Sequence, residues 1–278
     1  MPHADKNGFR VAPVFALFAG LALLGTACMA ETGEPEALEN VDEVGQSWEE
    51  FRASVTVEPG TGFFIVDGDI PLYSEAELER FYVEHVQHGD LAIGTSGGAD
   101  VKWSSAQQNN ITYCVSTSFG SRYDEVVQAM ASATGAWEAA ANVDFIHLSQ
   151  HDSSCTASQS GVVFDVRPVN SGQYLARAFF PNSSRSKRNV LIDSSAFDQG
   201  NSPSVTGVLR HELGHTLGFR HEHTRPEAGT CFEDNNWRAL TSYDSASVMH
   251  YPQCNGTGNW SLTLTTKDKT GAAAVYGG

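Results

Sequence analysis

His211, Glu212, His215 and His221 have the residue types and the spacing to bind a metal ion and to move a proton beside it. On a helix, residues four apart share one face, so the imidazoles of His211 and His215 can grip the same ion. Glu212 can orient a metal-bound water without ligating the metal. Three protein ligands leave one coordination position of zinc open, which is typical of catalytic sites. The spacing therefore predicts one catalytic Zn²⁺ held by the three histidines.

Two further features separate this pattern from chance. A bare His-Glu-x-x-His also occurs on amphipathic helices with two surface histidines. Here Gly218 can adopt backbone angles closed to other residues, so the helix can end there and the chain can turn back with His221. A second pattern, Ser247-Val248-Met249-His250-Tyr251, places Met249 28 residues beyond His221. Together they favour a metal site over an ordinary helix.

A zinc motif followed by a methionine turn resembles the metzincin metallopeptidases. Glu222, directly after the third histidine, and the Met249-His250-Tyr251 triplet are similar to the astacin branch of that clan. The motif His-Glu-Leu-Gly-His, with Arg220 before the third ligand, also resembles that of a bacterial group named for its His-Glu-Ile-Gly-His motif. The motifs that carry the resemblance lie between Val208 and Pro252; elsewhere it is one of general layout.

The resemblance implies an endopeptidase that hydrolyses protein or peptide substrates with a zinc-activated water. In that mechanism Glu212 accepts the proton of the attacking water and later delivers it to the departing amine. The resemblance further implies that Tyr251 lies near the metal as a swinging fifth ligand. It implies that Met249 forms a hydrophobic floor beneath the histidines without binding zinc.

Two acidic residues are linked by the resemblance to latency and activation. Astacin-type propeptides carry a Phe-x-Gly-Asp stretch whose aspartate caps the zinc, and Val66-Asp67-Gly68-Asp69 matches it except for Val66. Asp69 is therefore a candidate latency ligand, although Gly-Asp pairs are also common in turns. The acid matching Glu222 is linked to the freed N-terminus of mature astacins. The alternative for Glu222 is a salt bridge to Arg220 or Arg225.

A protein of another class remains as the alternative function. It is a binding or adhesion protein that keeps a zinc-stabilised fold without turnover. An intact Glu212 counts against it, since a structural site needs no acid aimed at the open position.

The elements that must position these residues predict an α+β fold, a metzincin-like domain with a mixed twisted sheet, a long backing helix, an active-site helix and a methionine turn. Helices are expected at about 74–88, 123–141, 204–217 and 266–276. Val126, Met130, Ala133 and Trp137 form the apolar stripe of the long helix. Strands are expected at 63–66, 110–116, 143–148, 162–166, 173–180 and 189–193, and the strand at 173–180 is a candidate edge for pairing with a peptide.

Residues 1–30 are typical of a signal peptide: Lys6 and Arg10 precede an apolar run from Val11 to Leu24, and small residues follow. Cys28 lies where a bacterial lipoprotein would be lipidated, which would anchor the protein to a membrane. However, Gly25 replaces the usual leucine, and ordinary cleavage after Ala27 or Ala30 competes. The protein is therefore expected to be exported, to the medium, the periplasm or the cell surface.

Four cysteines remain beyond the signal-like stretch: Cys114, Cys155, Cys231 and Cys254. An even number of cysteines in an exported chain favours two disulfides. Three pairings are open, and proximity in the chain favours Cys114–Cys155 with Cys231–Cys254. Free buried thiols are the alternative.

The acidity of the chain is concentrated in one segment. Residues 31–100 contain 17 of the 33 acidic residues and two basic ones, whereas residues 101–278 contain 15 acidic and 13 basic residues. Residues 31–50 are also poor in apolar side chains, which predicts disorder. We expect an acidic, propeptide-like segment at 31–100, a glycine- and serine-rich boundary at 94–105, and a catalytic domain at 101–278. The charge gives no support to nucleic-acid binding.

Overall fold

The computed structural model describes residues 48–66, 68–85, 93–198, 202–233 and 237–278. The expected signal peptide, its apolar run and Cys28 lie outside these residues, as does Asp67. Within the described residues, no helix is both long and apolar enough to cross a membrane.

The core of the fold is a five-stranded sheet in the order β7-β6-β8-β10-β9. β6 (Ile111–Val115), β7 (Phe145–His147), β8 (Phe164–Val169) and β10 (Asn189–Asp193) are parallel to one another, and β9 (Ala176–Arg177) runs antiparallel to β10. The parallel strands are rich in β-branched and aromatic residues, which pack well when a sheet is buried. The mixed sheet predicted from the sequence is therefore confirmed.

The strand expected over residues 173–180 is much shorter than predicted. Only Ala176 and Arg177 pair with β10, opposite Ile192 and Leu191. Before them the chain turns at Gly172, whose φ is +67°, and the Asp193 carboxylate accepts hydrogen bonds from the Ser171 and Gly172 amides. This turn replaces the first residues of the predicted strand. β9 remains an edge strand of the five-stranded sheet.

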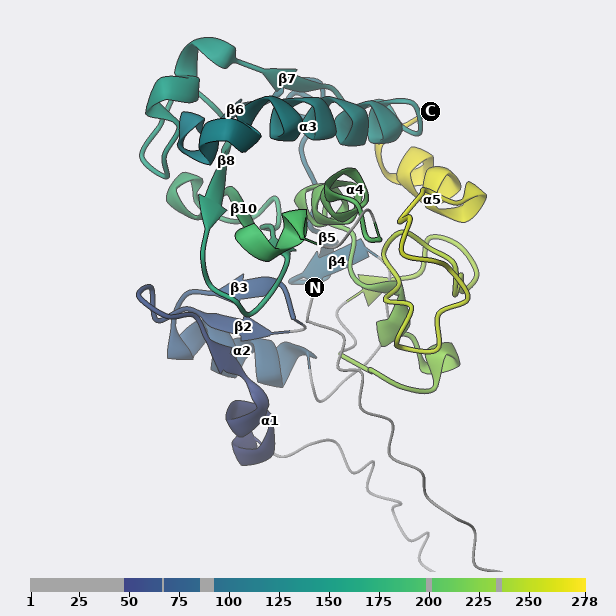
Figure 1. The fold of residues 1–278 in the computed structure, drawn as a ribbon. Coiled ribbons are helices and arrows are strands. Elements are labelled where there is room, and N and C mark those ends of the chain that lie inside the picture. Colours follow the sequence, from purple (N-terminus) through teal and green to yellow (C-terminus); the bar gives the residue numbers. More distant parts are fainter. Residues whose placement is uncertain (1–47, 67, 86–92, 199–201, 234–236) are drawn as a thin grey trace, which may run out of the picture. The chain divides into compact units, whose positions relative to one another are not determined.

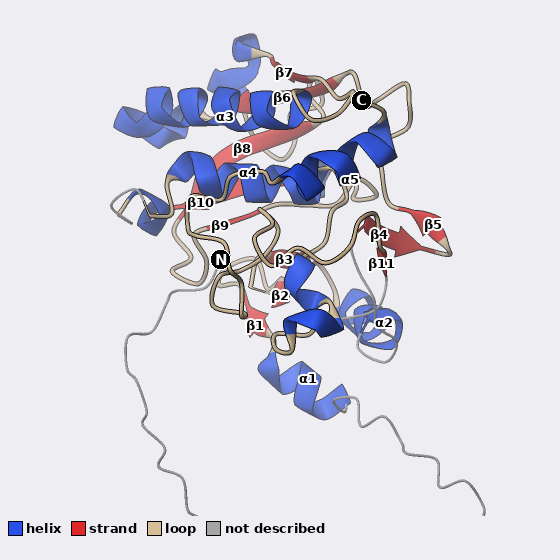
Figure 2. Cartoon of the chain, turned by 90° about the vertical axis from the view of Figure 1, so that its right-hand side faces the viewer, coloured by secondary structure: helices blue, strands red, loops and turns tan. Residues whose placement is uncertain are grey.

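Helices α3 (Tyr123–Glu138) and α4 (Val205–Thr216) pack against each other, and α5 (Thr266–Tyr276) closes the same core (Figures 1 and 2). The predicted apolar stripe of α3 is buried, and Trp137 also donates from Nε1 to the Arg210 carbonyl of α4 at 2.8 Å. α5 begins with a capping box between Thr265 and Asp268. Short 3-10 helices lie at Thr117–Arg122, Ser149–Ser154, Arg185–Lys187, Ser194–Phe197, Glu222–Thr224 and Pro226–Ala228.

The N-terminal segment of the described chain has a small core of its own. It contains α1 (Trp48–Ser54), α2 (Glu75–His85) and an antiparallel sheet of β1 (Thr56–Val57), β2 (Phe64–Val66) and β3 (Ile70–Leu72). Phe180 is the only hydrophobic residue from outside the segment that packs against this cluster among the described residues. Residues 48–50, part of the stretch 31–50 expected to be disordered or loosely attached, instead begin α1, and the Trp48 ring packs at an angle against those of Phe51 and Tyr82.

Residues 93–100 form β4 (Ile93–Ser96) and β5 (Ala99–Asp100) rather than a loose boundary. β4 pairs with β11 (Trp237–Arg238), far along the chain, and the Ile93 side chain is buried in the main core. By its contacts, this stretch is part of the body that contains the zinc motif.

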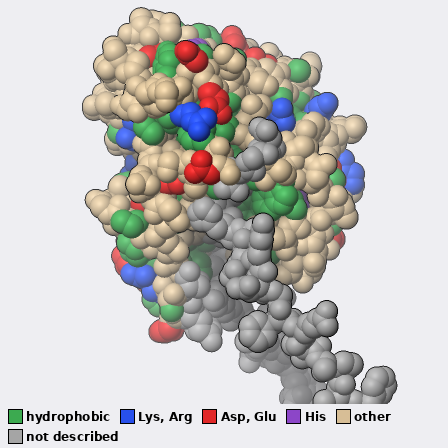
Figure 3. All heavy atoms as spheres, viewed as in Figure 1, with side chains coloured by type: hydrophobic (Ala, Val, Ile, Leu, Met, Phe, Trp, Pro, Cys, Tyr) green, Lys and Arg blue, Asp and Glu red, His purple; other side chains and the backbone are tan. Residues whose placement is uncertain are grey.

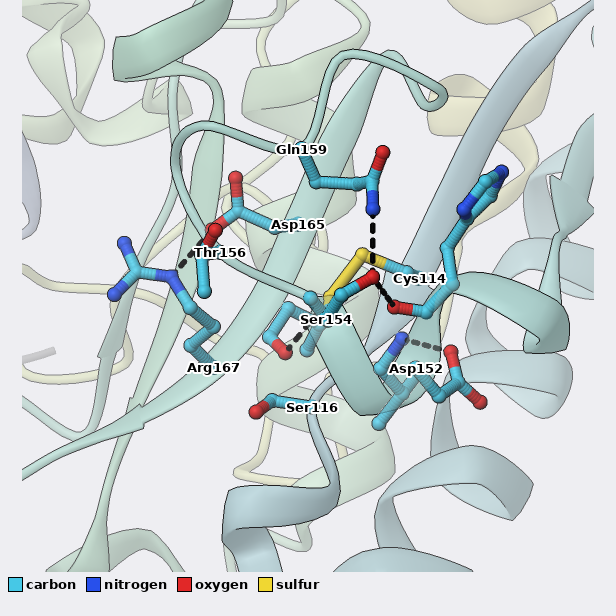
Figure 4. The surroundings of a disulfide bond; sticks show 12 residues. Cys114, Ser116, Asp152, Ser154, Thr156, Gln159, Asp165 and Arg167 are labelled. Carbon is cyan, nitrogen blue, oxygen red and sulfur yellow. Dashed lines mark hydrogen bonds and ion pairs between the residues drawn. A yellow bond between two sulfur atoms is a disulfide. The ribbon is translucent and has the colours of Figure 1, made fainter.

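Two disulfides are present, Cys114–Cys155 and Cys231–Cys254, the pairing that chain proximity favours. Figure 4 shows the first bridge between β6 and a loop, with Asp152 on one side and the Asp165–Arg167 ion pair on the other. Asp152 accepts a hydrogen bond from the Val115 amide at 2.8 Å, which fixes the loop against β6.

Candidate metal centre

Helix α4 carries the first two histidines of the motif. Its N-terminus is capped by Ser204, whose side chain accepts a hydrogen bond from the Gly207 amide. One turn apart near its C-terminus, His211 and His215 project from the same face, and both are fully or almost fully buried. Their ring centroids are 5.0 Å apart. The helix thus places two imidazoles side by side, as the spacing predicts.

Gly218 brings the third histidine back to this face. Its φ is +95°, and a Cβ at this position would lie 1.9 Å from the Val101 carbonyl oxygen, so only glycine fits. The helix ends just before it, and the chain returns so that His221 Nε2 lies 3.0 Å from His211 Nε2. The predicted role of Gly218 in ending the helix is confirmed.

Each of the three imidazoles is oriented through its Nδ1. His211 Nδ1 lies 2.8 Å from the Val248 carbonyl, and His215 Nδ1 lies 2.8 Å from the Phe219 carbonyl. His221 Nδ1 lies 2.5 Å from a Glu233 carboxylate oxygen. Because all three partners accept, each Nδ1 carries a proton, so each Nε2 presents a lone pair once a metal ion is bound.

These lone pairs converge, which is unfavourable unless a cation lies between them. The Asp69 carboxylate faces the same point, 3.4 Å from His211 Nε2, 3.7 Å from His215 Nε2 and 3.6 Å from His221 Nε2. Tetrahedral zinc with imidazole ligands would separate ligand nitrogens by about 3.3 Å, close to the 3.0 Å between His211 and His221. The donor set, its burial and its separations fit Zn²⁺, with Asp69 as a fourth candidate ligand.

Glu212 lies in the same region as a fully buried carboxylate. Neither of its oxygens has a hydrogen-bond partner among the described residues. Burial, followed by the negative charge of Asp69, raises the pKa of Glu212 well above its ordinary value. A buried and unpaired carboxyl of this kind is suited to accept and return a proton in the site.

The methionine turn packs directly beneath the helix. A Cβ added to Gly214, between the two helical histidines, would lie 2.3 Å from Met249 Sδ. The Met249 side chain is buried, and Gly214 provides the room for it. The structure therefore brings Met249 to the position that the resemblance implies, under the histidines.

Tyr251 faces the candidate ligands. Its ring centroid lies 4.6 Å from that of His221 and 5.4 Å from that of His211. Its hydroxyl donates a hydrogen bond of 2.5 Å to Asp69 Oδ2. Burial acts to raise the pKa of Asp69, but in the metal-free site the positive charge of protonated His221 and the hydrogen bonds with His211 and His221 hold that pKa well below its ordinary value. Asp69 is thus an ionised carboxylate at the centre of the site.

Glu222 lies outside this cluster, in a buried ion pair with Arg225 at 3.0 Å. It also accepts a hydrogen bond from the Asp244 amide at 2.8 Å. Burial raises the pKa of Glu222 to about 7, and the nearby Arg225 opposes that rise. This contact is the salt-bridge alternative considered from the sequence. His223 and His250 contact Tyr251 and Tyr243 respectively, and neither belongs to the group that includes Asp69.

Glu233 is the residue that sequence reasoning missed. Its carboxylate lies 2.5 Å from His221 Nδ1 and 2.7 Å from His223 Nε2, and it is almost fully buried. No sequence motif predicts an acidic residue at the position of Glu233 relative to His221. The available signal was indirect, since Glu233 follows Cys231 by two residues and the Cys231–Cys254 bridge ties this segment to the methionine turn.

Comparisons with known proteins agree with this geometry. Residues 102–228, which include the three histidines, match the family model Peptidase_M10, described as Matrixin. This part of the chain is therefore similar to a metallopeptidase domain of the metzincin type.

Among curated proteins, the chain is 32% identical over 88 residues to blastula protease 10 of Paracentrotus lividus, which is 25% of this chain and 15% of that protein. It is 37% identical over 82 residues to the zinc metalloproteinase nas-30 of Caenorhabditis elegans, which is 22% of this chain and 11% of that protein. It is also similar to an astacin-like metalloprotease toxin of Loxosceles intermedia, 36% identical over 75 residues, which is 20% of this chain and 29% of that protein. The relatives within the clan are thus astacin-like, although the matches span a small part of the first two.

Among solved structures, the chain is similar to myroilysin, with 18% identity and a TM-score of 0.44 over 66% of this chain and 98% of that one. A hatching enzyme of Oryzias latipes gives 18% identity and a TM-score of 0.41 over 63% of this chain and 96% of that one.

Proposed function

We propose that this chain is an exported zinc endopeptidase, made as a latent precursor. One observation carries the proposal: three buried imidazoles, with their Nδ1 protons already engaged, aim their Nε2 lone pairs at one point beside the unpaired Glu212 carboxylate. His211, His215 and His221 would hold the ion. When bound, zinc would supply a Lewis acid that polarises a peptide carbonyl and makes a water more acidic.

The residues of the chain then have distinct tasks in hydrolysis. Glu212 takes the proton from the water that attacks the peptide carbonyl and returns it to the departing amine. Its pKa, raised by burial, suits it to hold that proton between the two steps. Tyr251, once released from Asp69, donates a hydrogen bond to the carbonyl oxygen as negative charge develops there. Met249 holds the helix and its histidines from below.

In this proposal, Asp69 keeps the precursor inactive. In the precursor its carboxylate faces all three histidines and accepts the hydrogen bond from Tyr251, so it blocks the position that a water and a substrate carbonyl need. The segment that carries Asp69 has its own core, and its contacts with the rest of the chain include the ion pairs Glu58–Arg177 and Glu77–Lys187. These features support an inhibitory segment that can leave without unfolding the catalytic domain.

We place the cut that releases this segment between residues 85 and 93 rather than at 100. β4 begins at Ile93 and pairs with β11, so a cut beyond it would remove a strand from the catalytic body. Export is supported by the two disulfides and by the signal-like N-terminus. The link between Glu222 and the new N-terminus, and the lipidation of Cys28, remain predictions.

Activity on casein or gelatin, measured with processed protein of known N-terminus, tests the proposal. We expect cleavage that a chelator abolishes, that added zinc restores, and that Glu212→Ala removes. The rival function, a zinc-stabilised binding protein without turnover, would be favoured if processed, zinc-loaded wild type cut nothing. Activity that survived Glu212→Ala would contradict the mechanism.

A further inference from the structure

A buried ion pair joins the N-terminal segment to the edge of the main sheet. Glu58, directly after β1, accepts a hydrogen bond from Arg177 Nε at 3.2 Å and another from Nη2 at 3.4 Å. The Tyr174 hydroxyl donates to the same carboxylate. The Glu58 and Arg177 side chains are only 2% and 1% exposed. Thr61 of its own segment donates to Glu58 Oε2 at 2.6 Å, so the buried carboxylate has donors on both sides of the contact.

These donors belong to the body that contains the metal site. Arg177 lies on β9, and its Nη1 donates to Asn189 Oδ1 of β10 at 3.0 Å, which holds the guanidinium in place without any help from Glu58. Tyr174 is fully buried just before β9. Removal of the N-terminal segment would leave this arrangement standing, with Nε and Nη2 of Arg177 lacking their acceptor.

The pair also lies close to the catalytic cleft. Phe180, three residues after Arg177, packs its ring 5.6 Å from that of His215. A cavity of about 690 Å³ beside the metal site is lined by both Phe180 and Tyr73. Glu58 and Tyr73 both belong to the N-terminal segment. When that segment leaves, the charged end of Arg177 therefore loses the side chain that covers it.

A buried guanidinium that loses its carboxylate needs another partner or water. We propose that Arg177, with Tyr174 and Asn189, forms a substrate subsite for an acidic side chain, which Glu58 fills in the precursor. This inference rests on the proposed peptidase function. A carboxylate suits the site because the planar guanidinium offers two parallel donors and the tyrosine hydroxyl a third.

The position of this subsite along a substrate follows from the strand. Three residues separate Arg177 from Phe180, which is about 10 Å along an extended chain. A peptide lying along β9 would therefore present its acidic residue about three residues from the cleaved bond. The catalytic region is nearly balanced in charge, with 15 acidic and 13 basic residues over 101–278, so it does not repel such a peptide strongly.

Paired peptides test the subsite with processed, zinc-loaded enzyme. Each pair carries Glu or Gln at one position, and the series scans four positions on either side of a cleaved bond. We expect kcat/KM to favour Glu at least about tenfold at one position near the third residue from the bond. Equal cleavage of Glu and Gln peptides at every position would overturn the subsite alone. Failure to cut any peptide would overturn the proposed function and the subsite with it.

Variants assign the preference to Arg177. Arg177→Gln should bring the Glu-to-Gln ratio close to one, and Arg177→Lys should retain part of it. Arg167→Gln is the matched control, since Arg167 pairs with Asp165 on β8 and should leave the ratio unchanged. Because the readout is a ratio within one enzyme sample, partial misfolding of a variant does not imitate the result. A wild-type ratio retained in Arg177→Gln would contradict the assignment.

Discussion

The Glu233 carboxylate accepts a hydrogen bond of 2.5 Å from His221 Nδ1, on the side of the imidazole opposite to the candidate metal position. The other two candidate ligands are oriented by neutral backbone carbonyls. His221 is therefore the one ligand whose basicity is set by a charge, and that charge comes from a residue outside the motif.

Glu233→Gln should weaken zinc binding by about 10- to 100-fold, because an amide orients the imidazole without raising its basicity. Competition with a chelator of known affinity at fixed pH measures the effect. Glu227→Gln is a suitable control, since Glu227 is about half exposed and pairs only with Arg225 in the described structure. Unchanged zinc affinity in Glu233→Gln would show that the carboxylate does not tune the ligand.

The Cys231–Cys254 bridge should support the metal site, whereas Cys114–Cys155 should support the fold alone. Replacing either pair with serine should cost about 2–4 kcal/mol of stability. Only the Cys231→Ser, Cys254→Ser variant should also lose zinc affinity, because that bridge fixes the segment that carries Glu233. Denaturant titration and metal competition on both variants separate the two effects. Equal zinc affinity in the two variants would refute the link.

Asp69→Asn should release activity in the uncut chain. The neutral amide is a weaker metal ligand than a carboxylate, and it loses the charged hydrogen bond with Tyr251. We expect the full-length variant to cut a small peptide at least about tenfold faster than full-length wild type, as judged from the strength of a charged hydrogen bond. Asp100→Asn, which breaks only the exposed contact with Arg238, is the control. A silent Asp69→Asn precursor that becomes active after processing would place latency elsewhere.

The Glu58–Arg177 pair should make the precursor less stable in acid. Burial acts to raise the pKa of Glu58, but the charge of Arg177 and the hydrogen bonds from Arg177, Thr61 and Tyr174 together outweigh it, so the pKa in the folded protein lies below the ordinary 4.5. A carboxyl whose pKa falls on folding stabilises the protein above its unfolded pKa and loses that effect as the pH falls through the folded value. The Tm difference between wild type and Glu58→Gln should be largest at neutral pH and should shrink below about pH 4. A difference that does not change with pH would contradict this assignment.

Gly214→Ala should disturb the contact between the helix and the methionine turn. The new Cβ would lie 2.3 Å from Met249 Sδ and 3.1 Å from Trp137, so we expect a loss of about 1–3 kcal/mol in the free energy of unfolding. Gly135→Ala on helix α3 is the matched control, because no atom lies within 4 Å of its added Cβ, and it should stabilise by about 0.5–1 kcal/mol. Equal effects of the two changes would rule out the packing argument.

The sequence predicts the metal site well because helical spacing and a glycine turn are local properties. His211 and His215 share a face through the 3.6-residue period, and the positive φ of Gly218 returns His221 within a few residues. Strand β10 and helix α5 are also found at their predicted bounds, since each is a continuous segment with clear ends.

Contacts between distant residues could not be predicted in the same way. Glu233 reaches His221 through a loop fixed by a disulfide, and Arg177 reaches Glu58 across 119 residues. The same holds for β4, whose glycine-rich sequence suggests a linker until its pairing with β11 is known. Alternation in residues 173–180 predicted a long strand, but the hydrogen bonds of the Asp193 carboxylate impose a turn there instead.

The small separate core of residues 48–82 has a consequence for what remains after release. Phe180 is the only outside hydrophobic residue that packs on that cluster among the described residues, so release of the segment, as proposed, would leave the main core in place. Under the proposed latency, activation would then change what occupies the metal site, Asp69 or a substrate, and would leave the fold around it as it is.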